Sequence, residues 1–167
     1  AYQTAWLKAH YPVEFLSAMC TNDMGDTSKL GVLIGEAKGL GVDVLPPDIN
    51  ESRINFSPAQ DGTVIRYGLA AIKGVGEAAV EAILTARGTE KPFKSLADLC
   101  DRVELRAMNR KVLEALIKAG ACDGFGATRA SLTAQIERTL ARASSTAADR
   151  ARGQETLFGL LEAGNSE

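Results

Sequence analysis

The chain has 167 residues, of which 46% are hydrophobic and 24% charged, with a formal net charge of −2. This composition is typical of a globular protein with one domain or two small ones, and it excludes an intrinsically disordered chain. No apolar run reaches the roughly 18 residues of a membrane span, and the first residues lack the pattern of a secretory signal. Three widely spaced cysteines indicate neither a disulfide framework nor a Cys-x-x-Cys metal site, so a cytosolic protein is expected.

Charge is distributed unevenly along the chain. Residues 1–52 hold three basic and seven acidic side chains, net −4. Residues 53–120 hold eleven basic and eight acidic side chains, net +3. Residues 121–167 hold five basic and six acidic side chains, net −1. The middle segment is therefore the one to test for an anionic partner, although its excess is too small to hold DNA by bulk charge alone.

The first third of the chain is predicted to be helical. Periodic apolar residues predict helices over 2–10 and 13–20, and a third helix from a cap at Asp26 or Thr27 to about residue 39. Gly31 and Gly35 each weaken the third helix by about 1 kcal/mol relative to alanine, which predicts close packing against a neighbour. A short strand over 42–45 ends at two prolines, which predict a stiff, extended linker.

The rest of the chain is predicted to hold one β-hairpin followed by helices. The strands are residues 54–57 and 63–67, and residues 58–62 have the composition of a turn. The predicted helices are 69–73, 77–86, 95–102, 109–119 and 128–143. Ser95, Asn109 and Thr128 are suited to N-caps, and Gly120 to the position after a helix end. Residues 141–153 predict a fraying helix end or a tether, so the expected fold class is mainly α with a small β-hairpin.

The most informative segment is a short helix, a Gly-Val-Gly turn at residues 74–76, and a second helix. Gly74 and Gly76 can take positive φ and leave room for an approaching surface. Their amides, with the free N–H groups of the second helix and Lys73 at the rim, form a donor site suited to phosphate. Such a site holds a nucleic-acid backbone without reading bases. The residues expected inside this hairpin are Ile72, Val75, Val80, Ile83 and Leu84.

This segment resembles the helix-hairpin-helix motif of DNA polymerases, ligases and repair enzymes. The alternative is a helix–helix turn that simply requires two glycines. Apolar residues at matching positions on both flanks favour the motif. Glu77 and Glu81 count against it, because they bring negative charge close to the phosphate site.

A second, degenerate hairpin follows, in which the helix over 109–119 runs into a turn with the single glycine Gly120. The pair predicts a tandem domain that bridges the minor groove by holding both strands. Arg102, Arg106, Arg110 and Lys111 form the densest basic cluster, which a solvated helix face explains equally well. The predicted contacts to the DNA backbone are Lys73, Gly74, Val75, Gly76, Arg106, Arg110, Lys111, Lys118 and Gly120.

Residues 154–158 resemble the Gln-x-x-Leu-Phe peptide that bacterial polymerases and repair factors insert into the sliding clamp. Leu157 and Phe158 would fill an apolar pocket on the clamp, and Gln154 would hydrogen-bond at its edge. Glu155 and Thr156 depart from the commoner residues at their places in this peptide.

The order of these segments is similar to part of the alpha subunit of bacterial DNA polymerase III, a C-family replicative polymerase. The residues that carry this resemblance are 2–15, 40–52, 66–76 and 116–121. The resemblance implies the end of a fingers region (1–48), a tandem helix-hairpin-helix domain (49–125), a helix and tether (126–153) and a clamp-binding peptide (154–158).

The resemblance also implies a role in DNA replication in the bacterial cytoplasm. The implied partners are double-stranded DNA, the sliding clamp and the other domains and subunits of the polymerase, with no membrane partner. The parent enzyme would be a nucleotidyltransferase that uses Mg²⁺ at palm aspartates. This chain has no Asp-x-Asp pair in a strand context, no phosphate loop and a single histidine, so we expect no catalytic residue, metal or cofactor in it.

Other interpretations of the sequence remain open. A helix-hairpin-helix repair enzyme would need a catalytic lysine or aspartate, for which Lys73 and Asp98 are the candidates. A lesion-bypass paralogue of the same subunit and a protein-interaction scaffold are further alternatives. The first helix lacks an N-cap, which favours a piece of a longer polypeptide.

Overall fold

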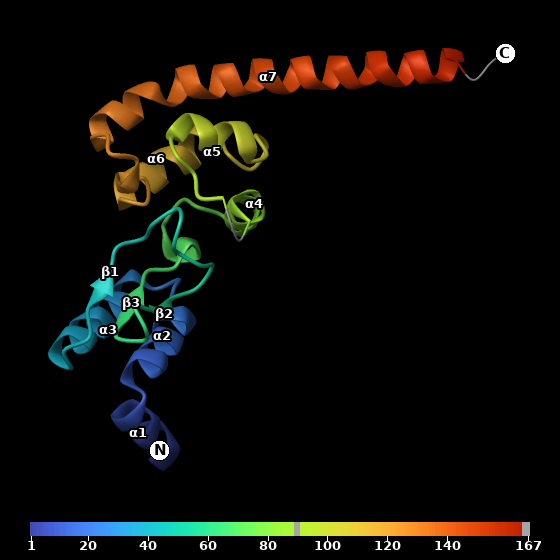
Figure 1. Ribbon diagram of the computed structural model, residues 1–167. Helices are drawn as coiled ribbons and strands as arrows, with labels where there is room; N and C mark the ends of the chain where they lie inside the picture. The colour runs from blue at the N-terminus through green and yellow to red at the C-terminus, as the bar shows by residue number, and fades with distance from the viewer. Residues whose placement is uncertain (89–90, 165–167) are drawn as a thin grey trace.

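The computed structural model describes the backbone of residues 1–88 and 91–164 and the side chains of residues 1–88 and 91–153. Over these ranges the chain is mainly helical with one small sheet, so the predicted fold class is confirmed. The described side chains form two hydrophobic cores, one in an N-terminal part and one in a helical part. Figure 1 shows the two parts in chain order, with the last helix extending beyond them.

The N-terminal part packs two of its helices against a small sheet. Its helices are α1 (Tyr2–His10), α2 (Pro12–Asn22) and α3 (Thr27–Gly39). The Asp26 carboxylate caps α3 by accepting hydrogen bonds from the Ser28 and Lys29 amides at 3.0 and 3.1 Å. The buried residues of this core are Val13, Leu16, Cys20, Leu30, Leu33, Ala37, Val42, Phe56 and Ile65.

The sheet has the strand order β1-β3-β2. Its strands are β1 (Val44–Leu45), β2 (Ser57–Ala59) and β3 (Val64–Arg66). β2 and β3 are antiparallel, with Ser57 opposite Arg66, so the predicted hairpin is confirmed, although β2 begins three residues later than expected. β1 lies parallel to β3, a pairing that the local pattern did not predict because it joins segments distant in sequence.

The close packing predicted at the glycines of α3 is wrong. A Cβ atom built at Gly31 or Gly35 meets no heavy atom within 4 Å, and neither residue is buried. The two glycines therefore weaken the solvent face of the helix without allowing a close approach of another element.

The helical part is built from short helices that pack beneath the start of a long one. Its elements are η1 (Leu69–Ala71), α4 (Glu77–Arg87), α5 (Leu96–Arg102), α6 (Arg110–Ala119), η2 (Asp123–Phe125) and α7 (Arg129–Gly164). The predicted N-caps are confirmed, because the side chains of Ser95, Asn109 and Thr128 each accept a hydrogen bond from the amide three residues later. Leu113 and Leu116 of α6 are fully buried.

The last helix is longer than predicted. The sequence favoured an end near Ala143 and then a fraying end or a tether, but α7 continues as helix to Gly164. Alanine and arginine, which are abundant over 141–153, are strong helix formers, and this accounts for the difference. Ala143 is buried, and the described side chains after it are exposed or partly exposed, so α7 leaves the body as an arm (Figure 1).

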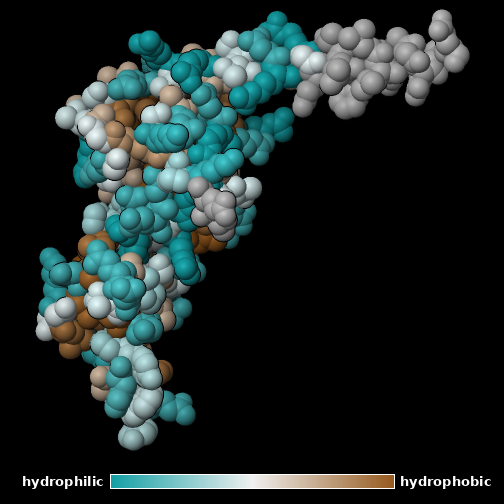
Figure 2. Space-filling view, in the orientation of Figure 1, coloured by the Kyte–Doolittle hydropathy of each residue, from teal (hydrophilic) through white to brown (hydrophobic). Residues whose placement is uncertain are grey.

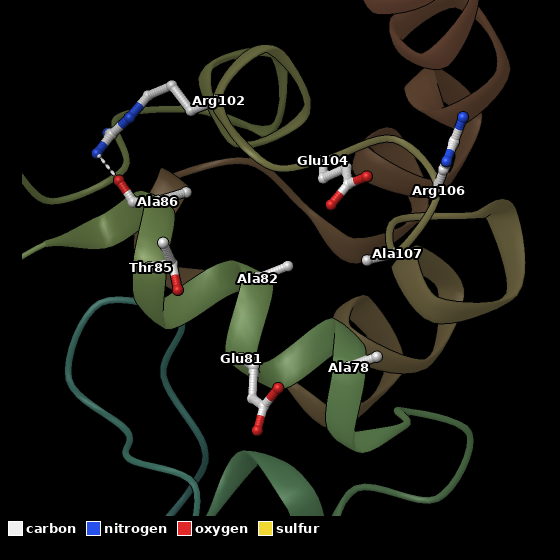
Figure 3. Close-up of a pocket in the computed structure, with 9 residues that line it drawn as sticks. All are labelled: Ala78, Glu81, Ala82, Thr85, Ala86, Arg102, Glu104, Arg106 and Ala107. Carbon is white, nitrogen blue, oxygen red and sulfur yellow. Dashed lines mark hydrogen bonds between the residues drawn. The ribbon is translucent and has the colours of Figure 1, made fainter.

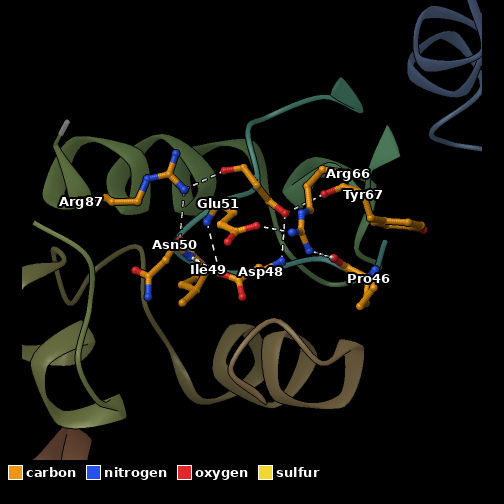
Figure 4. Close-up of polar contacts among 9 residues, drawn as sticks. Pro46, Asp48, Ile49, Asn50, Glu51, Arg66, Tyr67 and Arg87 are labelled. Carbon is orange, nitrogen blue, oxygen red and sulfur yellow. Dashed lines mark hydrogen bonds and ion pairs between the residues drawn. The ribbon is translucent and has the colours of Figure 1, made fainter. Parts of the chain in front are cut away.

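The segment 46–53, which joins the two parts, is organised by its own polar groups (Figure 4). The Asp48 carboxylate accepts hydrogen bonds from the amides of Asn50 and Glu51 at 2.7 and 3.1 Å. The segment predicted to be a stiff linker therefore contains a closed turn directly after the two prolines.

The same segment is anchored to the helical part. The Asn50 side chain accepts a hydrogen bond from the Phe93 amide at 2.7 Å and donates one to the Phe93 carbonyl at 2.9 Å. Arg87, at the end of α4, donates from Nη1 to the carbonyls of Ile49 and Ser52 at 3.2 and 2.8 Å (Figure 4). These contacts hold the junction segment against the helical part.

Hydrophilic residues cover most of the face seen in Figure 2, and hydrophobic ones surface in patches over both the helical part and the N-terminal part. Among the described residues, no helix has both the length and the apolar character required to cross a lipid bilayer.

Candidate nucleic-acid interface

The first predicted hairpin is built on apolar side chains. η1 and α4 are joined by a turn whose tip, Val75, is 7% exposed and packs in the same core as Ile72, Val80 and Ile83. The Val75 amide donates to the Ile72 carbonyl at 3.1 Å. The inward direction predicted for Val75 is confirmed, so its side chain is not available to a ligand at this turn. The helix before the turn is a single 3₁₀ turn, shorter than predicted.

The two glycines of the turn have different conformations. Gly74 has φ +93°, in the left-handed region that favours glycine. Gly76 has φ −78°, so the positive φ that the sequence allowed for it is not used. A Cβ atom at Gly76 would meet no heavy atom within 4 Å. Gly74 is therefore required by the turn itself, whereas Gly76 leaves the surface open at the start of α4.

The amides around this turn are exposed donors. Within the described ranges, the N–H groups of Gly74, Gly76, Glu77 and Ala78 have no hydrogen-bond partner, and all four residues are exposed. The start of α4 also carries the partial positive charge of a helix N-terminus. The turn therefore presents several N–H groups that can donate hydrogen bonds to an anion.

Lysines from a distant segment complete this donor surface. Lys73, Gly74, Lys111 and Lys118 line one groove of about 640 Å³ between the hairpin and α6. The hairpin lies directly on α6, because a Cβ atom built at Gly74 would be 3.4 Å from the Cβ atom of Ala115. The fold thus brings together four of the residues predicted to contact DNA.

The negative charge in this groove is paired. Glu114 is the one acidic residue among its described lining, and Arg110 Nε donates to its carboxylate at 2.8 Å. This hydrogen bond holds the pKa of Glu114 below its usual value. Arg110 also forms an ion pair with Glu137 of α7, so its guanidinium is engaged by two carboxylates. The three lysines therefore determine the charge of the groove.

The second hairpin is closed by contacts within the chain. Gly120 has φ +88° and its amide donates to the Ile117 carbonyl at 3.0 Å. Arg129 donates from Nη1 to the Lys118 carbonyl at 3.2 Å, and its hydrogen bond to Asp123 at 2.6 Å lowers the pKa of that carboxyl group. A Cβ atom at Gly120 would lie 2.7 Å from Arg129 Nη2. The group that this hairpin presents at Gly120 is therefore the Arg129 guanidinium.

The basic cluster predicted over 102–111 is dispersed. Arg102 turns inward, donates to the Ala86 carbonyl at 2.6 Å, and places its guanidinium 4.5 Å from the centre of the Phe93 ring. Figure 3 shows this bond, and shows Arg106 on the opposite side of a separate groove beside α4. Of the cluster, Lys111 alone is among the described residues that line the groove at the first hairpin.

The predicted clamp-binding residues lie on the arm. Gln154, Leu157 and Phe158 belong to the helical backbone of α7, and their side chains lie outside the described residues. Their role in clamp binding stays a prediction.

The helix-hairpin-helix motif family matches residues 41–132, a range that contains both hairpins and most of the residues that line the groove at Gly74. The chain belongs to the helix-hairpin-helix family. This family assignment covers more than half of the chain and agrees with the buried Val75 and the exposed glycine amides described above.

This helix-hairpin-helix chain is similar to DNA polymerase III subunit alpha from several bacteria. It is 45% identical to the proteins of Vibrio cholerae serotype O1 and Escherichia coli strain K12 over 161 residues. It is 46% identical to that of Neisseria meningitidis serogroup A over 162 residues. The alignments cover 96–97% of the chain and 14% of each relative. The resemblance to polymerase III alpha subunits is thereby confirmed.

Some features of this interface were missed from the sequence. Lys111 and Lys118, both predicted to contact DNA, are seven residues apart and so lie on one face of α6. Their approach to Lys73 depends on packing between segments that are distant in sequence. The position of Arg129 over Gly120 depends on such packing as well, so local sequence did not indicate either feature. No group of three or more potential metal-ligating His, Cys, Asp or Glu residues occurs in the part of the chain that the structure describes.

Proposed function

We propose that this chain is a duplex-DNA-binding region of a replicative DNA polymerase III alpha subunit, without catalytic residues of its own. The observation that carries the proposal is the groove lined by Lys73, Gly74, Lys111 and Lys118. It lies beside the N–H groups at the start of α4 that have no hydrogen-bond partner among the described residues. The family assignment and the polymerase relatives support it.

The chemistry of this groove suits the DNA backbone. Phosphate oxygens would accept hydrogen bonds from the amides of Gly74 and Gly76, each contributing about 1.5–3 kcal/mol because the acceptor is charged. The three lysines would displace counterions from neighbouring phosphates. None of these groups reads a base edge, so the chain would hold duplexes of different sequence equally well.

We expect the wild-type chain to bind two duplexes of unrelated sequence and equal length with the same affinity, within about twofold. Fluorescence anisotropy with labelled duplexes measures this. A tenfold preference for one sequence would contradict backbone binding, and no binding of either duplex would favour the interaction scaffold instead.

The contacts of Lys73 and Asp98, the candidate catalytic residues of a repair enzyme, give that alternative less support than the DNA-binding proposal has. Asp98 accepts a hydrogen bond from the Lys94 amide at 3.0 Å and pairs with Arg102 at 3.3 Å, which is a structural arrangement at the start of α5. Lys73 is exposed at the rim of the groove. Cleavage of a lesion-bearing duplex by the chain would establish the repair enzyme.

We also propose that residues 154–158 bind the sliding clamp, with α7 carrying them away from the DNA-binding groove (Figure 1). A few buried anchor residues dominate such contacts, each worth about 2 kcal/mol or more. Leu157→Ala/Phe158→Ala is therefore expected to weaken binding to the cognate clamp at least 30-fold in surface plasmon resonance.

The matched control for this change is Glu155→Ala/Thr156→Ala, which alters the two intervening residues and is expected to change clamp affinity less than threefold. Clamp binding by the Leu157→Ala/Phe158→Ala variant at wild-type strength would refute the clamp proposal, while DNA binding by the same variant should be unaffected.

A further inference from the structure

A second cationic groove lies at the other end of α4 from the glycine turn. It encloses about 360 Å³. Its described lining includes three cations, Arg53, Arg87 and Lys91, together with Asn50 and the single acid Glu51. These residues come from the junction segment, from the end of α4 and from the chain leading to α5, and none of them belongs to the groove at Gly74.

The acid in this groove does not cancel the three cations. Glu51 is ion-paired to Arg66, which also donates to the Pro46 carbonyl at 3.0 Å, and Figure 4 shows the Glu51 carboxylate directed to Arg66. The Oδ1 atom of the nearby Asp48 accepts hydrogen bonds from the amides of Asn50 and Glu51 in its own turn, at 2.7 and 3.1 Å. Among the described residues, positive charge therefore remains in excess between Arg53, Arg87 and Lys91.

Arg87 is held ready for an anion. Its Nη1 atom is fixed by the two carbonyls of the junction segment, at 3.2 and 2.8 Å. Burial lowers the pKa of Arg87; Asp48 raises it, and the charge of the neighbouring Arg53 lowers it again. In the described part of the chain, the side chains of Arg53 and Lys91 have no hydrogen-bond or ion-pair partner. An anion bound between Arg53, Arg87 and Lys91 would reduce the repulsion among these cations. It would also accept hydrogen bonds from the remaining N–H groups of Arg87.

We propose that Arg53, Arg87 and Lys91 bind a second phosphate of the DNA backbone, an inference that rests on the proposed function of the chain. α4 has 11 residues and is therefore about 16 Å long. Since one strand of a duplex carries a phosphate every 3.4 Å along the axis, this length corresponds to about five phosphates. The chain thus has a phosphate contact at each end of α4, the glycine amides at its start and the arginine cluster at its end.

The test removes the two cations whose side chains have no hydrogen-bond or ion-pair partner among the described residues. Arg53→Ala/Lys91→Ala is expected to weaken binding of a 20-base-pair duplex about tenfold at low salt. It should also reduce the slope of log K against log salt by about one, for the single phosphate that the variant no longer neutralises. The matched control, Lys38→Ala/Arg138→Ala, removes the same charge from exposed sites on α3 and α7 and should leave both values near wild type. Equal weakening by the two double variants would overturn the proposal.

Amide and Arg87 Nε shifts in ¹H–¹⁵N NMR spectra separate this inference from the proposed function. Addition of duplex is expected to shift Arg87 and Gly88 as well as Gly74 and Gly76. Shifts at the glycine turn alone would overturn the second site and leave the proposed function standing. Shifts at Arg87 and Gly88 alone would support the second site and would overturn the assignment of a phosphate site to the glycine turn. Shifts at neither would overturn both.

Inorganic phosphate, added at the same phosphate concentration, distinguishes a DNA phosphate from a free one. The proposal predicts that the duplex shifts Arg87 at a much lower concentration than inorganic phosphate does. Saturation of Arg87 by inorganic phosphate with no shift on addition of duplex would overturn the DNA assignment.

Discussion

A Gly76→Glu variant is expected to bind duplex DNA about 30-fold more weakly than the wild-type chain while folding normally. Gly76 has φ −78° and open space around its Cβ position, so glutamate fits without backbone strain or collision. Its carboxylate would lie among the free amides at the start of α4, where we place a DNA phosphate. Loss of a hydrogen bond to a charged group costs about 1.5–3 kcal/mol, which corresponds to a 10- to 100-fold change in affinity.

Two controls isolate the cause of this loss. Gly76→Ala occupies the same space without the charge and should bind within about threefold of wild type. Gly35→Glu adds the same charge on the solvent face of α3, where a Cβ atom also meets nothing within 4 Å, and should bind nearly as well as wild type. If Gly76→Glu and Gly35→Glu weaken binding equally, the effect is one of net charge and the assignment of the glycine turn is wrong.

A Gly68→Ala variant is expected to lose about 3 kcal/mol of unfolding free energy. A Cβ atom at Gly68 would lie 2.6 Å from the carbonyl carbon of Asn55, 2.7 Å from the Ile54 oxygen and 2.8 Å from the Phe56 nitrogen. All three are backbone atoms, which cannot move aside as a flexible side chain can. Overpacking of this kind costs about 1–3 kcal/mol, and separation of the two segments adds the loss of hydrogen bonds between them.

The hydrogen bonds at risk run from the Leu69 amide to the Arg53 carbonyl at 2.9 Å and from the Ala70 amide to the Ile54 carbonyl at 3.0 Å. They hold the start of the first hairpin on the N-terminal part. For a domain of this size, thermal unfolding of Gly68→Ala should occur roughly 6–12 °C below wild type. Gly35→Ala is the control and should be neutral or stabilising by up to about 1 kcal/mol. Unfolding of Gly68→Ala at the wild-type temperature would show that the contact is not tight.

The features that could be predicted from sequence are those determined by neighbouring residues. Asn109 accepts the hydrogen bond expected of an N-cap, and Val75 turns inward as the flanking apolar pattern indicated. Gly74 has the positive φ that its place in a tight turn allowed. Each of these depends on a few adjacent residues, so local physical rules were sufficient.

The features that could not be predicted depend on partners far along the chain. Arg110 is engaged by Glu137, and Arg102 by carbonyls near the end of α4, so a cluster that is dense in sequence does not form one surface. The convergence of Lys73 with Lys111 required the packing of the hairpin on α6. The length of α7 was missed because an alanine-rich segment is compatible with both a helix and a tether.

Backbone binding by this chain is tested most directly by a salt titration of the wild-type protein with a 20-base-pair duplex. Contacts with three to five phosphates predict that log K falls linearly with log salt, with a slope of about −3 to −4.5, and that a second duplex of unrelated sequence gives the same line. An affinity that does not change with salt, or a line that differs between the two sequences, would contradict it.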